Sequence, residues 1–156
     1  MTENKKGRIK DQVKNEMKLR LPSLSVNESV ARSAVAAFCA QLDPSAAELA
    51  DIKCVVSEAV TNCIVHGYRD TVGIVYITVT LYASGTVKLE IRDKGVGIDD
   101  VKAARQPLYT TDAAGERSGM GFTVMESFTD KIRVASKPMK GTKIVMYKKI
   151  TGKSGM

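Results

Sequence analysis

The chain has 156 residues, 44% of them apolar and 26% charged, and a net charge of +7, which together indicate a single globular domain. No run approaches the roughly 20 apolar residues that span a bilayer, and the first residues are polar, so we expect a cytoplasmic protein without a membrane span or a secretory signal. The excess of basic residues lies at the two ends of the chain. Residues 1–18 carry six Lys or Arg against three acids, and residues 143–156 carry four lysines and no acid. Residues 19–142 carry fourteen charges of each sign, and this neutral body argues against direct binding of nucleic acid.

The first part of the chain predicts one strand followed by two helices. Residues 16–24 alternate apolar and polar side chains, as in a short strand. Residues 25–42 and 45–68 carry apolar residues at helical spacing, and the second of these is the longest helical pattern in the chain. Each begins with a serine that is followed three residues later by a glutamate, the pattern of a capping box; the pairs are Ser25 with Glu28 and Ser45 with Glu48.

The second part of the chain predicts two hairpins that flank a glycine-rich loop and a helix. The loop, 95–119, has no strong period and is long for a connection, so we expect a functional lid or a disordered segment. Residues 120–130 follow it with a helical pattern. The strands of the first hairpin are 73–83 and 85–94, and those of the second are 131–138 and 141–150.

Strands that cluster in hairpins together with helices predict an α+β fold. We expect a two-layer α/β sandwich in which helices cover one face of a mixed, mainly antiparallel sheet. The alternating strands and helices of a Rossmann fold are missing. This domain is expected over residues 16–150, after a charged, disordered extension at 1–15 and before a tail at 151–156.

One predicted helix carries a polar strip. Glu58, Asn62 and His66, the only histidine of the chain, recur every fourth residue and therefore lie near one another on one side of the helix. Burying a carboxylate is costly unless it is paired or solvated. The strip therefore faces a cavity, a metal or a partner, or else it is a solvated helix face.

Three glycine-containing stretches can let a ligand approach the backbone. Asp93, Gly95 and Gly97 follow a strand directly, and an aspartate there can accept a hydrogen bond from an exocyclic amine such as that of adenine. "RSGMGF", from Arg117 to Phe122, leads into a helix, whose free N–H groups attract an anion. "KGT" at 140–142 places a glycine and a hydroxyl at the start of the last strand. Each stretch alone is more often an ordinary turn than a ligand site.

Together and in this order, these motifs resemble the nucleotide site of the Bergerat-fold (GHKL) ATPases over roughly residues 16–150. The resemblance implies bound ATP and Mg²⁺, with Asn62 as a ligand of the ion, and Mg²⁺ that keeps phosphate and water ligands needs few protein ligands. Competing motifs fail. "TGKS" at 151–154 lacks the first glycine of a P-loop, and the motifs of eukaryotic protein kinases are absent.

Longer strings narrow the resemblance to one family. "VSEAVTNCIVHGY", "IRDKGVGI", "ARQPLYTT" and "ERSGMGFTVMESF" are similar to the sporulation anti-sigma-F factors of endospore-forming Firmicutes, and the similarity extends over nearly the whole chain from about residue 13. It implies an ATP-dependent serine kinase that binds and inhibits a sporulation sigma factor (sigma-F). It further implies that this kinase phosphorylates and inactivates an anti-anti-sigma factor, and that it is a homodimer.

The same resemblance gives each motif residue an expected role. Glu58 and Arg117 are the expected catalytic residues, Glu58 as the general base for a serine hydroxyl and Arg117 as a sensor of the γ-phosphate or a contact to the partner. Arg32 is expected to contact both the sigma factor and its competitor, and His66 to orient the end of its helix. The expected nucleotide-binding residues are Asn62, Asp93, Gly95, Gly97, Gly119, Met120, Gly121 and Thr142, below a lid at 104–118.

Three alternatives stay open. The ATP-binding half of a histidine kinase needs a phospho-acceptor histidine elsewhere, whereas His66 lies inside the nucleotide motif. A non-catalytic binding module that uses nucleotide only as a switch has no need of Glu58. A regulator that binds nucleic acid directly is disfavoured by the neutral body.

Overall fold

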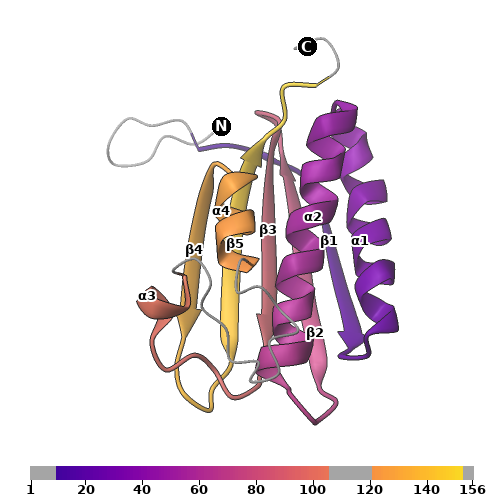
Figure 1. Ribbon diagram of the computed structural model, residues 1–156. Coiled ribbons are helices and arrows are strands. Elements are labelled where there is room, and N and C mark those ends of the chain that lie inside the picture. The colour runs from indigo at the N-terminus through magenta and orange to yellow at the C-terminus, as the bar shows by residue number, and fades with distance from the viewer. Residues whose placement is uncertain (1–9, 106–120, 153–156) are drawn as a thin grey trace.

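The computed structural model describes residues 10–105 and 121–152 and shows two layers, a five-stranded sheet and a set of helices that covers one of its faces (Figure 1). The strand order is β1-β2-β3-β5-β4. The strands are β1 (Val13–Pro22), β2 (Ile74–Tyr82), β3 (Thr86–Asp93), β4 (Lys131–Ser136) and β5 (Thr142–Lys149). The helices are α1 (Val26–Cys39), α2 (Ala46–Asn62), α3 (Val101–Ala104) and α4 (Gly121–Ser127), with a 3₁₀ turn, η1 (Ala40–Leu42), and a π-turn, η2 (Cys63–Gly67).

The predicted two-layer α/β sandwich with a mainly antiparallel sheet is confirmed. Every strand pairing among the described residues is antiparallel. β1 begins at Val13, three residues before the predicted strand, because Val13 still pairs with Tyr82 beyond a register shift. No helix in the described ranges is both long and apolar enough to cross a bilayer.

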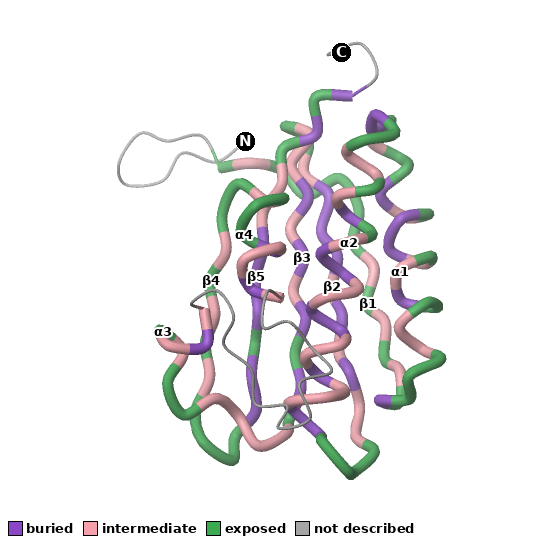
Figure 2. Tube along the Cα trace, in the orientation of Figure 1, coloured by how far each residue is buried: buried purple, intermediate pink, exposed green. Residues whose placement is uncertain are grey.

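The core fills the space between the helices and the sheet (Figure 2). Alternate residues of β2 are buried, as expected for a strand with one face against helices. The matching face of α2 is apolar at helical spacing. The buried residues of these two elements are Val75, Ile77, Val79, Thr80 and Leu81 of β2 and Ile52, Val55, Val56, Ala59 and Val60 of α2. This packing fixes which sides of α2 remain available for polar residues.

The predicted capping box at the start of α1 is wrong. Ser25 has helical backbone angles (φ −54°, ψ −35°) and its side chain makes no capping hydrogen bond, whereas a capping residue usually has extended angles. Glu28 instead accepts a hydrogen bond from Arg32 Nη1 at 3.1 Å. The Glu28 carboxylate is therefore used in a hydrogen bond with Arg32 on the helix surface, and not in capping the first turn.

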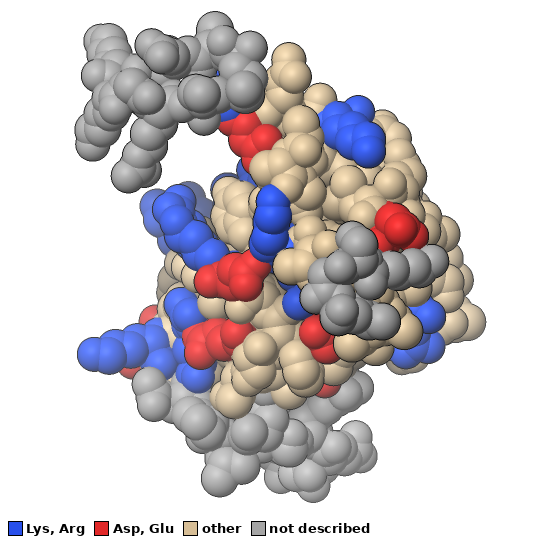
Figure 3. All heavy atoms as spheres, turned by 90° about the horizontal axis from the view of Figure 1, so that it is seen from above, with Lys and Arg blue, Asp and Glu red and all other residues tan. Residues whose placement is uncertain are grey.

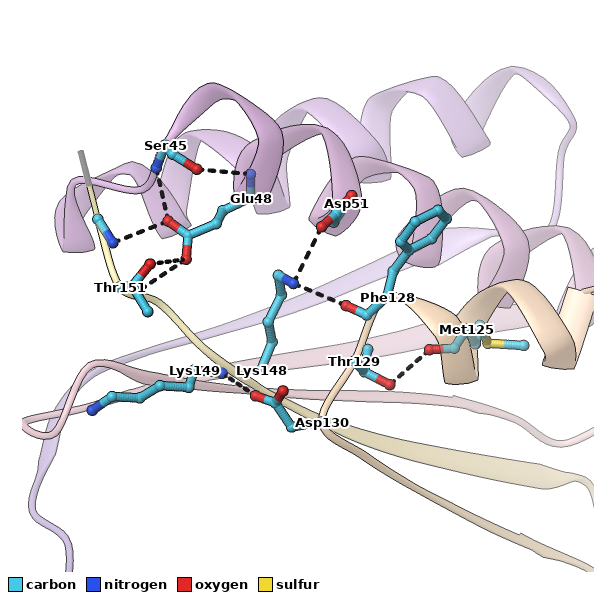
Figure 4. A network of polar contacts seen from close by, with 11 residues as sticks. Ser45, Glu48, Asp51, Met125, Phe128, Thr129, Asp130, Lys148, Lys149 and Thr151 are labelled. Atoms are coloured by element: carbon cyan, nitrogen blue, oxygen red, sulfur yellow. Dashed lines mark hydrogen bonds and ion pairs between the residues drawn. The ribbon is translucent and has the colours of Figure 1, made fainter. Parts of the chain in front are cut away.

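The predicted capping box at the start of α2 is confirmed, and it also fixes the end of β5. The Ser45 hydroxyl accepts from the Glu48 N–H at 3.1 Å, and Glu48 Oε1 accepts from the Ser45 N–H at 2.9 Å. The same carboxylate accepts from the N–H groups of Thr151, at 2.7 Å, and Gly152, at 3.0 Å, and from the Thr151 hydroxyl (Figure 4). Nearby, Lys148 joins β5 to Asp51 of α2 at 3.3 Å and to the carbonyl of Phe128 at 3.0 Å.

We expect the Glu48→Gln variant to be less stable than wild type by about 1 kcal/mol, with a difference that depends on pH. Partial burial acts to raise the pKa of Glu48, but the hydrogen bonds from Ser45, Thr151 and Gly152 outweigh it and lower the pKa from 4.5 to about 2. A lowered folded-state pKa means stability that is present above pH 4.5 and is lost as the pH falls toward 2. Thermal unfolding at a series of pH values should show the stability difference between Glu48→Gln and wild type shrinking over that window. The control variant Asp70→Asn, which changes an exposed side chain, should show no such shrinking.

Three basic side chains gather around one tyrosine of the sheet. On the face without helices, Arg20, Arg92 and Lys94 all lie within 5.1 Å of the centre of the Tyr76 ring, and hydrogen bonding from Lys94 contributes most to lowering the pKa of Tyr76. In the view from above, basic and acidic side chains lie next to one another (Figure 3). The absence of nucleic-acid binding stays a prediction, because the zero net charge of residues 19–142 does not reveal this basic cluster.

Candidate functional site

The polar strip of α2 faces the start of α4. Glu58 and Asn62 are both partly exposed, so neither polar side chain needs a buried partner to offset a loss of hydration. A Cβ placed on Gly121 would lie 3.3 Å from Glu58 Oε2 and 3.4 Å from Asn62 Oδ1, a distance at which a neighbour must yield. The fold therefore brings two predicted motifs together, the E-x-x-x-N helix and the second glycine of G-M-G.

α2 changes its geometry immediately after Asn62. Residues Cys63–Gly67 form a π-turn, which the Tyr68 N–H closes on the Cys63 carbonyl at 2.9 Å. Wide turns of this kind often occur at functional sites. His66 lies within the turn, and its carbonyl accepts from Arg69 Nε at 3.4 Å. The prediction of one regular helix over 45–68 is corrected here, because the π-turn redirects the chain toward β3.

The π-turn packs directly on the D-x-G-x-G turn after β3. A Cβ on Gly67 would lie 2.8 Å from the Asp93 carboxylate, and one on Gly95 would lie 2.0 Å from the Gly67 carbonyl oxygen. The Gly67 carbonyl accepts from the Val96 N–H at 2.9 Å. Glycine is therefore required at 67 and 95 by backbone contact between the two turns, whether or not a ligand is bound.

Asp93 is the most buried charged group of the site, with 4% of its surface exposed. Burial raises the pKa of its carboxyl above the ordinary 3.8, and hydrogen bonds from the Gly95 N–H, the Cys63 thiol and the Thr142 N–H partly offset this. The Gly95 bond is 2.9 Å long. Because two carboxylate oxygens can accept about four hydrogen bonds, Asp93 retains acceptor capacity for one more donor.

The glycine turn at 140–142 lies against the D-x-G-x-G turn. Gly141 has φ +86°, and a Cβ there would lie 2.1 Å from the Asp93 carbonyl oxygen; Gly97 has φ +75°, and a Cβ there would lie 2.1 Å from the Lys137 carbonyl oxygen. Thr142 is 9% exposed and pairs with Asp93 across β3 and β5. Asp93 and Thr142, both predicted to bind the nucleotide, are therefore adjacent.

Arg32 of α1 reaches the helix that carries Glu58. Its Nη1 donates to Glu28 Oε1 at 3.1 Å and to the Ser57 hydroxyl at 3.3 Å, and its side chain is 40% exposed. Ser57 immediately precedes Glu58. The residue predicted to bind partners therefore contacts α2 at the residue that precedes the predicted base in the sequence.

Several predicted site residues lie outside the described residues. These are Arg117, Gly119, Met120 and the lid from residue 106 to 118. Their roles stay predictions. Residues 104 and 105 are described, and the Arg105 side chain forms an ion pair with Glu126 of α4.

Three contributors to the site were missed in the sequence. The Cys63 thiol faces Asp93, and burial foremost, together with the charge of that carboxylate, raises the pKa of the thiol. The Tyr68 hydroxyl donates to the Ile74 carbonyl at 2.6 Å and accepts from the Lys94 N–H at 2.8 Å. Ser136 binds Thr142. Their spacing gave no signal, because each depends on the register between separate elements.

The arrangement fits a nucleotide with magnesium. The described residues contain no cluster of three His, Cys, Asp or Glu that could hold a metal ion. Asn62 Oδ1 is an oxygen that could serve as a ligand of Mg²⁺ together with phosphate and water oxygens. A buried acceptor at Asp93 suits a base that carries an amine. Asp93 and Asn62 adjoin the two ends of the π-turn, Asp93 beside Gly67 and Asn62 before Cys63.

Comparison with known proteins agrees with this geometry. The model of the family described as "Histidine kinase-like ATPase domain" matches residues 21–148. The chain is 54% identical over 145 residues to the anti-sigma F factor of Priestia megaterium, covering 92% of this chain and 99% of that protein. It is 56% identical over 140 residues to the anti-sigma F factor of Geobacillus sp. (strain WCH70), covering 89% and 95%.

Solved structures share the fold at low sequence identity. The crystal structure of the RsbU and RsbW domains of a Mycobacterium tuberculosis protein aligns with a TM-score of 0.61 at 15% identity, covering 87% of this chain and 32% of that one. The histidine kinase domain of a blue-light activated histidine kinase from Erythrobacter litoralis aligns with a TM-score of 0.52 at 16% identity, covering 80% and 65%.

Proposed function

The chain belongs to the histidine kinase-like ATPase domain family and, within it, to the anti-sigma F factors, and from this premise we propose that it binds and inhibits sigma-F and is an ATP-dependent serine kinase. Its substrate is the anti-anti-sigma factor, which phosphorylation inactivates. It works as a homodimer in the cytoplasm, with Mg²⁺ beside the nucleotide.

One observation carries the proposal: the segment from Glu58 at the end of α2 to Gly67 of the π-turn joins the motifs of a nucleotide site through direct contacts. At one end Glu58 and Asn62 adjoin Gly121. At the other, Gly67 adjoins the buried Asp93. The segment from Glu58 to Gly67 therefore runs between a position for phosphates and a base-recognition position, which supports a nucleoside triphosphate lying along this segment.

Each residue then has a chemical task. Asp93 accepts a hydrogen bond from the exocyclic amine of adenine, with Thr142 beside it. Asn62 offers an oxygen to Mg²⁺, which neutralises phosphate charge and orients the phosphates. Glu58 accepts the proton of the incoming serine hydroxyl. Phosphoryl transfer requires mainly positioning and charge stabilisation, so a single carboxylate within reach of the hydroxyl is a sufficient base.

Partner binding is expected close to this chemistry. Arg32 is partly exposed and donates to Ser57, the residue before Glu58. A protein that contacts Arg32 is therefore held against α2, the helix that carries the proposed base. This supports the proposal that the sigma factor and the anti-anti-sigma factor compete for Arg32, with Arg117 as a second contact.

The test is a phosphorylation assay with the purified chain, ATP, Mg²⁺ and the anti-anti-sigma factor. We expect phosphate on a serine of the added protein, acid-stable and dependent on both ATP and Mg²⁺. Labelled phosphate on His66, or acid-labile phosphate, would favour the histidine-kinase alternative. ATP binding without any transfer would favour a nucleotide-switched binding module.

A further inference from the structure

Ser136, at the end of β4, binds three partners at once. Its hydroxyl oxygen lies 2.9 Å from the Gly141 carbonyl oxygen, 2.8 Å from the Thr142 hydroxyl oxygen and 2.8 Å from the Ile98 N–H nitrogen. Ile98 follows the D-x-G-x-G turn, while Gly141 and Thr142 belong to the glycine turn at 140–142. One serine therefore joins β4 to both turns of the site.

The three contacts fix the direction of each hydrogen bond. The Ile98 N–H can only donate, and the Gly141 carbonyl can only accept. The Ser136 hydroxyl has one hydrogen, so all three contacts are satisfied together only if that hydrogen goes to the Gly141 carbonyl and the Thr142 hydroxyl donates to Ser136. If the Ser136 hydroxyl instead donated its single hydrogen to Thr142, its hydrogen bond to the Gly141 carbonyl would be lost.

This direction determines what Thr142 can offer a ligand. With its proton given to Ser136, the Thr142 oxygen presents lone pairs only. Asp93 lies opposite on β3 and is an acceptor as well. Two adjacent acceptors match the exocyclic amine of adenine. They repel a carbonyl oxygen such as O6 of guanine.

We infer that Ser136 is a positioning residue for base recognition, which keeps the Thr142 hydroxyl oriented as an acceptor toward an amine-bearing base. The inference rests on the proposed function, because it assigns the same site a means of selecting its nucleotide. If Ser136 loses its hydroxyl, the Thr142 proton can turn toward the Asp93 carboxylate, where it occupies an acceptor that the base requires.

The experiment measures the Kd of ATP and of purine riboside triphosphate, which lacks the 6-amino group, with Mg²⁺ and the full chain. The variants are Ser136→Ala, Ser136→Thr, Thr142→Val and the double variant Ser136→Ala with Thr142→Val. The ratio of the two Kd values is the readout, because a general loss of stability changes both in parallel. Thermal unfolding of each variant confirms that it is folded.

We expect Ser136→Ala to reduce the preference for ATP by about three- to tenfold, the value of one hydrogen bond, and Ser136→Thr, which keeps a hydroxyl, to retain it. In the Thr142→Val background, Ser136→Ala should reduce the preference no further. An unchanged ratio in Ser136→Ala, or independent effects of the two substitutions, overturns the inference while the proposed function stands. If the wild-type chain binds neither nucleotide, the proposed function fails and the inference with it.

Discussion

Replacing Glu58 with glutamine is expected to reduce phosphorylation of the anti-anti-sigma factor by about a hundredfold or more, the usual contribution of a general base, while the Kd of ATP changes by less than about threefold. Glutamine keeps the size of the side chain beside Gly121 but cannot take a proton from the serine hydroxyl. ATP binding should survive, since Asp93 and Asn62 are unchanged. A phosphorylation assay and titration calorimetry measure the two quantities separately.

Asp51→Asn is the matched control for Glu58→Gln. It removes one negative charge from the same helix, two turns earlier, where Asp51 pairs with Lys148 at 3.3 Å and has no place in the proposed chemistry. We expect it to phosphorylate at nearly the wild-type rate. If Glu58→Gln phosphorylates as fast as this control, another group is the base, and the assignment of Glu58 has to be abandoned.

The local patterns predicted the elements well because each depends on residues close in sequence. Two runs rich in β-branched residues located β2 and β3, and the serine–glutamate pair located the start of α2 correctly. The same pair failed at Ser25, since a capping box also requires an extended backbone at its first residue, which the turn after β1 does not supply. Both serines are therefore suitable capping residues by type, but only Ser45 has the extended backbone angles that a capping box requires.

The site was predictable only as an ordered set of motifs. Spacing placed Glu58 and Asn62 on one side of a helix, but it could not show that a π-turn brings Gly67 against Asp93, because that contact joins residues 26 positions apart in sequence. Ser136 was missed for the same reason. Its partners become visible only when the register of β4 with β5 sets it opposite Thr142.

Asp93→Asn is expected to weaken ATP binding by about a hundredfold, from the loss of one hydrogen bond and a new clash between donors. The wild-type carboxylate is 4% exposed and already accepts from Gly95 and Thr142. Asparagine can offer its one oxygen to these donors, but its NH₂ group then points toward the amine of adenine. The fold should survive, since the amide has nearly the same shape and no charge to desolvate.

The pH dependence of binding gives Asp93 a second test. Because burial raises the pKa of its carboxyl above 3.8, the folded protein takes up this proton earlier than an exposed aspartate does as the pH falls, and the protonated group loses acceptor capacity. ATP affinity in wild type should therefore decline through that raised pKa, and this decline should be missing in Asp93→Asn. The exposed Asp99→Asn, in the same loop, should keep both the affinity and its pH dependence. Equal ATP affinity in Asp93→Asn and Asp99→Asn would show that the base is bound elsewhere.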